Sequence, residues 1–191
     1  MRIFAVVTLS LVLTIILNGC TTRQVSHKLG SSTEQRLITY SIEQMIAELP
    51  EQDFSVFSQD KVFVKSHFVV DGPVVNYADQ MLRLDLLRRF NLTIVDDISV
   101  ADVELHVFFT SLATDSDVFG LSIPFINATD TSQSTRIDLL AIDMFHGISE
   151  MMYYVKHRSS NQVVKKGKIK ARVRTDDVST PVISFPVSDI D

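Results

Sequence analysis

An alternation of charged residues with small or apolar ones, KKGKIKARVR from Lys165 to Arg174, is the feature that most constrains the fold. Successive side chains of a β-strand point to opposite faces, so this stretch has one cationic face and one small, apolar face. It predicts a strand of an antiparallel sheet that lies on a core. The cationic face holds Lys166, Lys168, Lys170, Arg172 and Arg174.

The chain as a whole is acidic, which limits what this cationic face can bind. It has 18 Lys and Arg against 23 Asp and Glu, a net charge of −5. General nucleic-acid binding is typical of proteins with a basic balance. We therefore expect no nucleic-acid partner.

The N-terminus has the form of a cleaved targeting segment. Arg2 precedes a run without charge from Ile3 to Leu17, and this run is shorter than the roughly 20 apolar residues that span a bilayer. The run leads into the sequence LNGC, which resembles the lipobox that signal peptidase II of bacteria cleaves before its cysteine. The resemblance implies that residues 1–19 are a lipoprotein signal peptide and that Cys20 carries lipid.

Cys20 is the only cysteine, so no disulfide is expected within the mature chain and no cofactor beyond the covalent lipid. The resemblance implies attachment to the membrane through acyl chains. By analogy with sorting in enteric bacteria, Thr21 implies the periplasmic face of the outer membrane. The alternative is a short N-terminal anchor with an incidental cysteine.

The mature chain predicts a tether followed by one domain. Residues 20–32 are polar, and residues 33–191 have the length of a single periplasmic domain. Ser32 to Gln35 has the form of a capping box, followed by apolar residues at helical spacing up to Pro50. A second helix is expected from Val74 to Phe90. We expect an α+β fold, with these two N-terminal helices packed on a mostly antiparallel sheet.

Strands are expected at Val62 to Val70, Leu92 to Val95 and Ala101 to Ala113. A loop is expected from Asp115 to Ser134, because polar residues, Gly120 and Pro124 gather there.

Residues 136–157 fit either one long helix or two strands. We favour two strands, Arg136 to Phe145 and Ile148 to His157, because Gly147 interrupts the apolar run. Ser159 to Asn161 then predicts a hairpin turn into the cationic stretch.

Four segments of the mature chain together resemble a loosely defined group of small bacterial α/β lipoproteins. They are STEQRLI, VADVELHV, SIP and IDLLAIDMFHGISEMMYYV. The resemblance implies an α/β fold and provides no active residues.

No motif predicts a catalytic or metal site. The five histidines have no ligand spacing. GLSIP, around Ser122, has proline where a nucleophile elbow needs its second glycine. The segment from Asp115 to Gly120 lacks the glutamate that ends a calcium loop.

Three interpretations of the cationic face stay open. It protects a strand edge from aggregation, it contacts anionic lipid, lipopolysaccharide or cell-wall polymer, or it binds an acidic protein, with the strand edge itself as a docking site.

The leading hypothesis for function is a non-enzymatic, lipid-anchored lipoprotein that binds or assembles another envelope component. One alternative is a lipid- or glycan-binding lipoprotein that uses the segment 115–134. Another is an envelope hydrolase, which needs a cleft with a histidine or paired carboxylates brought together by the fold.

Overall fold

The computed structural model describes residues 23–24, 31–126 and 134–190. Cys20, the expected signal peptide and part of the expected tether lie outside the described residues. In chain order the elements are β1 (Arg23–Gln24), α2 (Ser32–Ala47), α3 (Glu51–Phe54), η1 (Ser55–Phe57), β2 (Lys61–His67), α4 (Pro73–Phe90), β3 (Thr93–Val95), η2 (Ile98–Val100), β4 (Val103–Ile126), β5 (Ser134–His157), β6 (Gln162–Ser179) and β7 (Ser184–Ser188).

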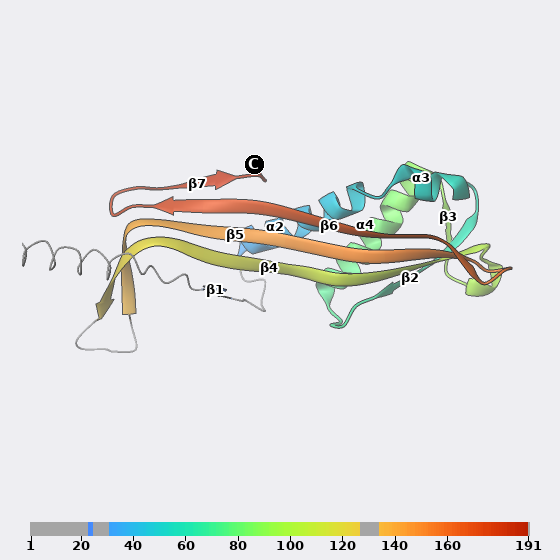
Figure 1. Ribbon diagram of the computed structural model, residues 1–191, viewed down its shortest axis with the longest axis horizontal. Helices are drawn as coiled ribbons and strands as arrows, with labels where there is room; N and C mark the ends of the chain where they lie inside the picture. Colours follow the sequence, from blue (N-terminus) through green and yellow to red (C-terminus); the bar gives the residue numbers. More distant parts are fainter. Residues whose placement is uncertain (1–22, 25–30, 127–133, 191) are drawn as a thin grey trace, which may run out of the picture.

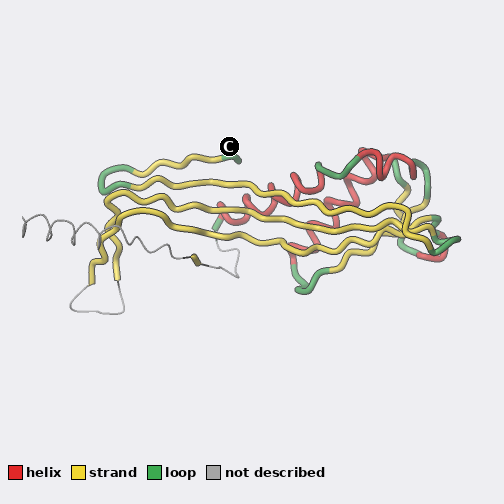
Figure 2. Tube along the Cα trace, in the orientation of Figure 1, coloured by secondary structure: helices red, strands yellow, loops and turns green. Residues whose placement is uncertain are grey.

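These strands form one sheet in the order β3-β2-β4-β5-β6-β7, and β1 also pairs with β4 (Figures 1 and 2). Strands β4 to β7 form an antiparallel meander. Strand β2 runs parallel to β3 and to β4, and helix α4 provides the long crossover that the parallel β2–β3 pair needs. The prediction of a mostly antiparallel α+β fold is confirmed.

Helices α2 and α4 gather over one face at one end of the sheet, and β4, β5 and β6 run on past them (Figure 1). The sequence therefore correctly predicts two N-terminal helices on a sheet. None of the described helices has the length and hydropathy needed to span a bilayer. The core includes these side chains of α2, α4 and the strands: Ile38, Ile42, Met45, Ala78, Leu82, Leu86, Val64, Leu105, Val107, Met151, Tyr153 and Ala171.

Helix α2 starts one residue earlier than the predicted capping box. The Ser31 hydroxyl accepts from the backbone N–H of Glu34 at 3.1 Å, and the Glu34 carboxylate accepts from the N–H of Ser31 at 3.0 Å. The box closes on Glu34 and not on Gln35, because a carboxylate accepts more strongly than an amide and lies favourably at a helix N-terminus. At the other end of α2, Arg89 of α4 donates to the carbonyls of Ile46 and Ala47.

The prediction of two strands in residues 136–157 is wrong, because β5 is one strand of 24 residues. Gly147 lies inside the β4–β5–β6 ladder, opposite Thr114 and Val173. Its missing side chain makes room for α2, since a Cβ built there would lie 2.2 Å from the carbonyl oxygen of Leu37. This glycine permits close approach of a helix and does not interrupt the strand.

The predicted loop from Asp115 is also largely wrong, because β4 continues to Ile126 and pairs with β5 throughout. Residues 127–133 lie outside the described residues. The part of β4 from Asp115 to Ile126 lies beyond the helices, and it resembles a loop in sequence because Gly120, Pro124 and the polar residues Asp115 to Asp117 fall within it. Pro124 is compatible with a strand that has few partners on its outer side.

The predicted helix from Val74 to Phe90 is confirmed as α4, and its buried residues are Ala78, Leu82, Leu86 and Phe90. The predicted hairpin turn joins β5 to β6, where Asn161 has a left-handed backbone conformation (φ 57°). Strand β2 ends at His67, earlier than predicted.

Candidate functional site

The face of the sheet opposite α2 and α4, called the open face, carries the cationic residues of β6. Ile169, Ala171 and Val173 point toward the helices and are buried. The residues between them are exposed and lie on the open face, as the alternation predicts. We call them the cationic row: Lys166, Lys168, Lys170, Arg172 and Arg174.

Beyond the helices the two faces of the sheet exchange polarity. On β6 the open face continues from Arg174 through Asp176 to Val178, whereas the other face continues from Val173 through Thr175 to Asp177. Val178 lies in a row with Ile142 of β5 and Phe185 of β7. The open face therefore becomes apolar where the helix-bearing face becomes polar.

The apolar part of the open face, called the distal face, extends over β4, β5, β6 and β7. Six of its side chains are more than half exposed: Phe119 (66%), Leu140 and Val187 (each 56%), Ile123 (52%), Leu121 and Phe185 (each 51%). No described element packs over it. Its members are Phe119, Leu121, Ile123, Leu140, Ile142, Met144, Val178, Phe185 and Val187.

The neighbouring residues on β5 neutralise only part of the positive charge of the cationic row. Glu150 contacts Lys170 at 2.6 Å and Lys168 at 3.9 Å, and the hydrogen bond from Lys170 holds the pKa of the Glu150 carboxyl below its usual value. Arg174 pairs with Asp176. Within the described part of the chain, no salt bridge involves Lys166 or Arg172. The row can therefore attract further anionic groups.

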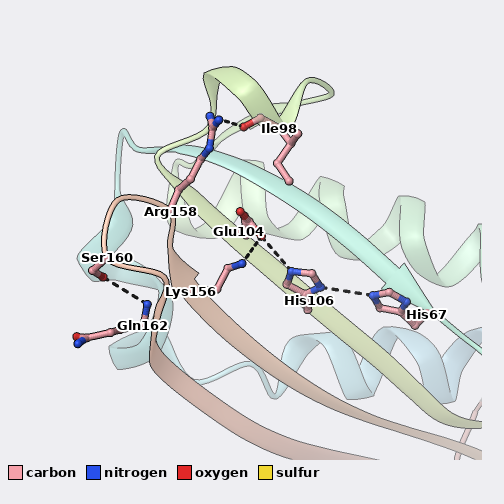
Figure 3. A network of polar contacts seen from close by, with 8 residues as sticks. All are labelled: His67, Ile98, Glu104, His106, Lys156, Arg158, Ser160 and Gln162. Atoms are coloured by element: carbon pink, nitrogen blue, oxygen red, sulfur yellow. Dashed lines mark hydrogen bonds and ion pairs between the residues drawn. The ribbon is translucent and has the colours of Figure 1, made fainter.

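A polar network at the helix-bearing end of the open face joins three strands (Figure 3). The rings of His67 and His106 lie 3.4 Å apart between nitrogens, and His106 contacts the carboxylate of Glu104 at 3.2 Å. Lys156 binds the same carboxylate at 2.9 Å and, as the main cause, lowers the pKa of Glu104. Burial is the main cause of the lowered pKa of His67.

This network brings together histidines that the sequence left scattered, since Glu104 and His106 lie on β4 and His67 on β2. It contains one carboxylate, that of Glu104, which Lys156 and His106 already engage, so among the described residues the network does not place His67 or His106 beside a carboxylate pair. The rings of Phe108 and Tyr154 extend it as an aromatic cluster. The described residues contain no group of three side chains suited to a metal ion.

His146 lies buried on the open face, between the cationic row and the distal face. It is 3% exposed, and its Nδ1 atom has no hydrogen-bond partner among the residues that the structure describes. Burial, together with Arg172 and Arg174, holds the pKa of His146 below its usual value. Its other ring nitrogen lies 3.9 Å from the carboxylate of Asp117.

The remaining candidates from the sequence are structural. Asp115 to Gly120 and Ser122 belong to β4, so neither a calcium loop nor a nucleophile elbow forms. The lipid- or glycan-binding alternative depends on a loop, and the structure has strand β4 there, with a shallow apolar hollow of about 270 Å³ beside Phe119 and Leu140.

The distal face is the feature that the sequence analysis missed. The alternation Phe119, Leu121, Ile123 was a signal for it, but Gly120 and Pro124 within the same stretch indicated a loop.

No known family matches the chain, and no curated protein matches its sequence. Among solved structures, the chain is similar to the LpoB C-terminal domains of Salmonella enterica (8% identity, TM-score 0.38) and Escherichia coli (10%, 0.38), each over 70% of this chain and 97% of that domain. It is also similar to a neuraminyllactose-binding hemagglutinin homolog from Helicobacter pylori (12% identity, TM-score 0.37, 70% of this chain and 73% of that one). Similarities at this level give no information on function.

Proposed function

We propose that this protein is a lipid-anchored lipoprotein of the bacterial envelope that binds another envelope protein, without catalysis, through the open face of its sheet. The distal face is the observation that carries the proposal. Apolar sheet faces are normally covered by a second layer, and exposed apolar patches of this kind mark interaction sites. The described chain supplies no such layer.

The N-terminal sequence supports the proposed anchor. LNGC precedes a polar segment, and Cys20 is the single cysteine. Lipid on Cys20 would hold the domain at a membrane surface, and the proposed location is the periplasmic face of the outer membrane. Metabolic labelling with an alkyne palmitate tests this step. We expect label in the wild type and none in Cys20→Ala, and equal labelling of both would contradict it.

Site-specific photo-crosslinking in cells tests the binding surface. A crosslinking residue is placed at Leu121 or Phe185 on the distal face, and at Ser184 as the matched control, because Ser184 is exposed next to Phe185 but points to the opposite face. We expect one discrete protein adduct from the two distal positions and none from Ser184. Adducts to lipid alone, to a second copy of the chain alone, or equally from all three positions would refute this function.

A further inference from the structure

We infer that the free edge of β6 binds an extended segment of the partner protein as an added antiparallel strand, in which acidic residues alternate with apolar ones. This inference rests on the proposed function and specifies how the partner binds. Strand addition uses backbone hydrogen bonds for affinity and alternate side chains for specificity.

The edge of β6 is paired over only part of its length. Strand β7 covers Thr175 to Ser179, and just beyond it the N–H of Asp189 donates to the carbonyl of Arg174 at 3.0 Å. From Lys166 to Arg172 no described strand pairs with the outer side of β6. This free stretch is about 24 Å long at the usual rise of a strand.

The direction of the Arg174 carbonyl identifies which backbone groups are free. In an antiparallel strand the N–H and C=O of one residue point to the same side, and successive residues alternate. The ladder with β5 is regular from Lys165 to Ser179. The outward groups therefore belong to the residues of the cationic row that precede Arg174: Lys166, Lys168, Lys170 and Arg172.

The charge of the edge selects acidic residues on one face of the added strand. Side chains directly opposite each other in a strand pair lie about 5 Å apart on the same face. Residues opposite Lys166 and Arg172 would thus meet cations that have no salt bridge within the described residues. Residues opposite Lys168 and Lys170 would share these lysines with Glu150.

The other face of the added strand would lie toward α2, on the side of the sheet where Val173 is buried. Ile190, which follows β7, is 4% exposed and packs with Leu37 and Val173 on the helix-bearing side. An added strand that continues the line of β7 would place its apolar residues in the same way. A hollow of about 480 Å³ lies there, with both polar and apolar lining residues: Tyr40, Glu43, Gln44 and Ala47 of α2, Arg172 and Val173 of β6, and Asp189.

Two peptides that differ only in the position of N-methyl groups test the inference against the purified full-length protein. Each is a soluble peptide of about nine residues in which glutamate alternates with valine or threonine, long enough to cover the free edge. One is N-methylated at the residues whose N–H faces β6, and the other at the residues whose N–H faces solvent. A scrambled peptide of equal charge is the composition control.

Fluorescence anisotropy measures the affinity of each peptide. We expect the peptide that is methylated on its solvent side to bind as tightly as the unmethylated peptide. The peptide that is methylated on the side facing β6 should bind at least about tenfold more weakly, which corresponds to the loss of one or two hydrogen bonds. Hydrogen exchange should slow at the amides of Lys168 and Lys170. Lys168→Thr/Lys170→Thr should weaken binding, whereas Lys65→Thr, on the open face of β2, should not.

Equal binding by both methylated peptides and the scrambled peptide would show an electrostatic contact only and overturn strand addition. Absence of binding by any of them would overturn it as well. The proposed function is judged separately, because its crosslinking positions lie on the distal face and not on the free edge of β6.

Discussion

Gly147→Ala tests whether the close approach of α2 to the middle of β5 holds the fold together. The new Cβ would lie 2.2 Å from the carbonyl oxygen of Leu37 and 3.0 Å from a methyl group of Val173. Ordinary contact begins near 3.4 Å, so α2 has to retreat by about 1.2 Å. The contacting atom is helix backbone, which cannot swing aside as a flexible side chain can.

The magnitude follows from what this retreat disrupts. Leu37 is fully buried and packs with Val173 and Ile190. Overpacking of this kind costs typically about 1 to 3 kcal/mol, and we expect about 3 because backbone has to move. For a domain of this size such a loss lowers the melting temperature by roughly 6 to 12 °C.

Gly72→Ala is the matched control, because a Cβ at Gly72 meets nothing within 4 Å and its φ of 170° is ordinary extended backbone. We expect its free energy of unfolding to change by less than about 1 kcal/mol, because the lower entropy of the unfolded chain is offset by the poorer N-cap that alanine makes for α4. Urea unfolding of both variants, followed by circular dichroism, measures the difference. Equal midpoints for the two variants would refute the proposed contact between α2 and Gly147.

Three further outcomes are expected for buried polar groups. Ser41→Ala should lower the free energy of unfolding by about 2 kcal/mol, because it leaves the buried hydroxyl of Ser149 without its 2.7 Å partner. If the double variant Ser41→Ala/Ser149→Ala lost the sum of the two single effects, the two hydroxyls would not be coupled and the prediction would be contradicted. Tyr153→Phe should cost about 1 to 2 kcal/mol in urea unfolding, because the phenol donates to Asp53 at 2.8 Å; no change would contradict it. The free energy of unfolding should fall as pH drops below about 6.5, by at most about 1.4 kcal/mol per pH unit, because the pKa of His146 is lowered in the folded state and the unfolded chain therefore takes up the proton first. His146→Gln should reduce this slope in urea unfolding measured at several pH values. An unchanged slope would contradict the prediction.

The fold was predictable where one face of an element is buried. The spacing of Ala78, Leu82 and Leu86 fixes α4, and the alternation around Ile169 fixes β6, because burial selects apolar residues at the period of the element. Gly147 was misinterpreted because its role depends on α2, which is more than a hundred residues away along the chain. A glycine that allows close approach and one that ends a strand are the same letter.

The candidate site was predictable only in part, for a related reason. The cationic row follows from the sequence, because its alternation is strict from Lys166 to Arg174. The distal face depends on four strands lying side by side, and β6 contributes only Val178 to it and β7 only Phe185 and Val187. Likewise, the contact of His67 with His106 depends on the parallel pairing of β2 with β4.

The exchange of polarity between the two faces also restricts how β4 and β5 can align during folding. A strand with uniform alternation can slip by two residues and keep every side chain on its proper face, so two such strands of 24 residues would have several nearly equivalent alignments. In β4 and β5, a slip of two residues would move the position at which the open face of one strand changes from polar to apolar relative to that position on its neighbour. In the native alignment Asp117 lies opposite Met144, at the border of the distal face, and a slip of two residues in one direction would place it opposite Ile142, further inside that face.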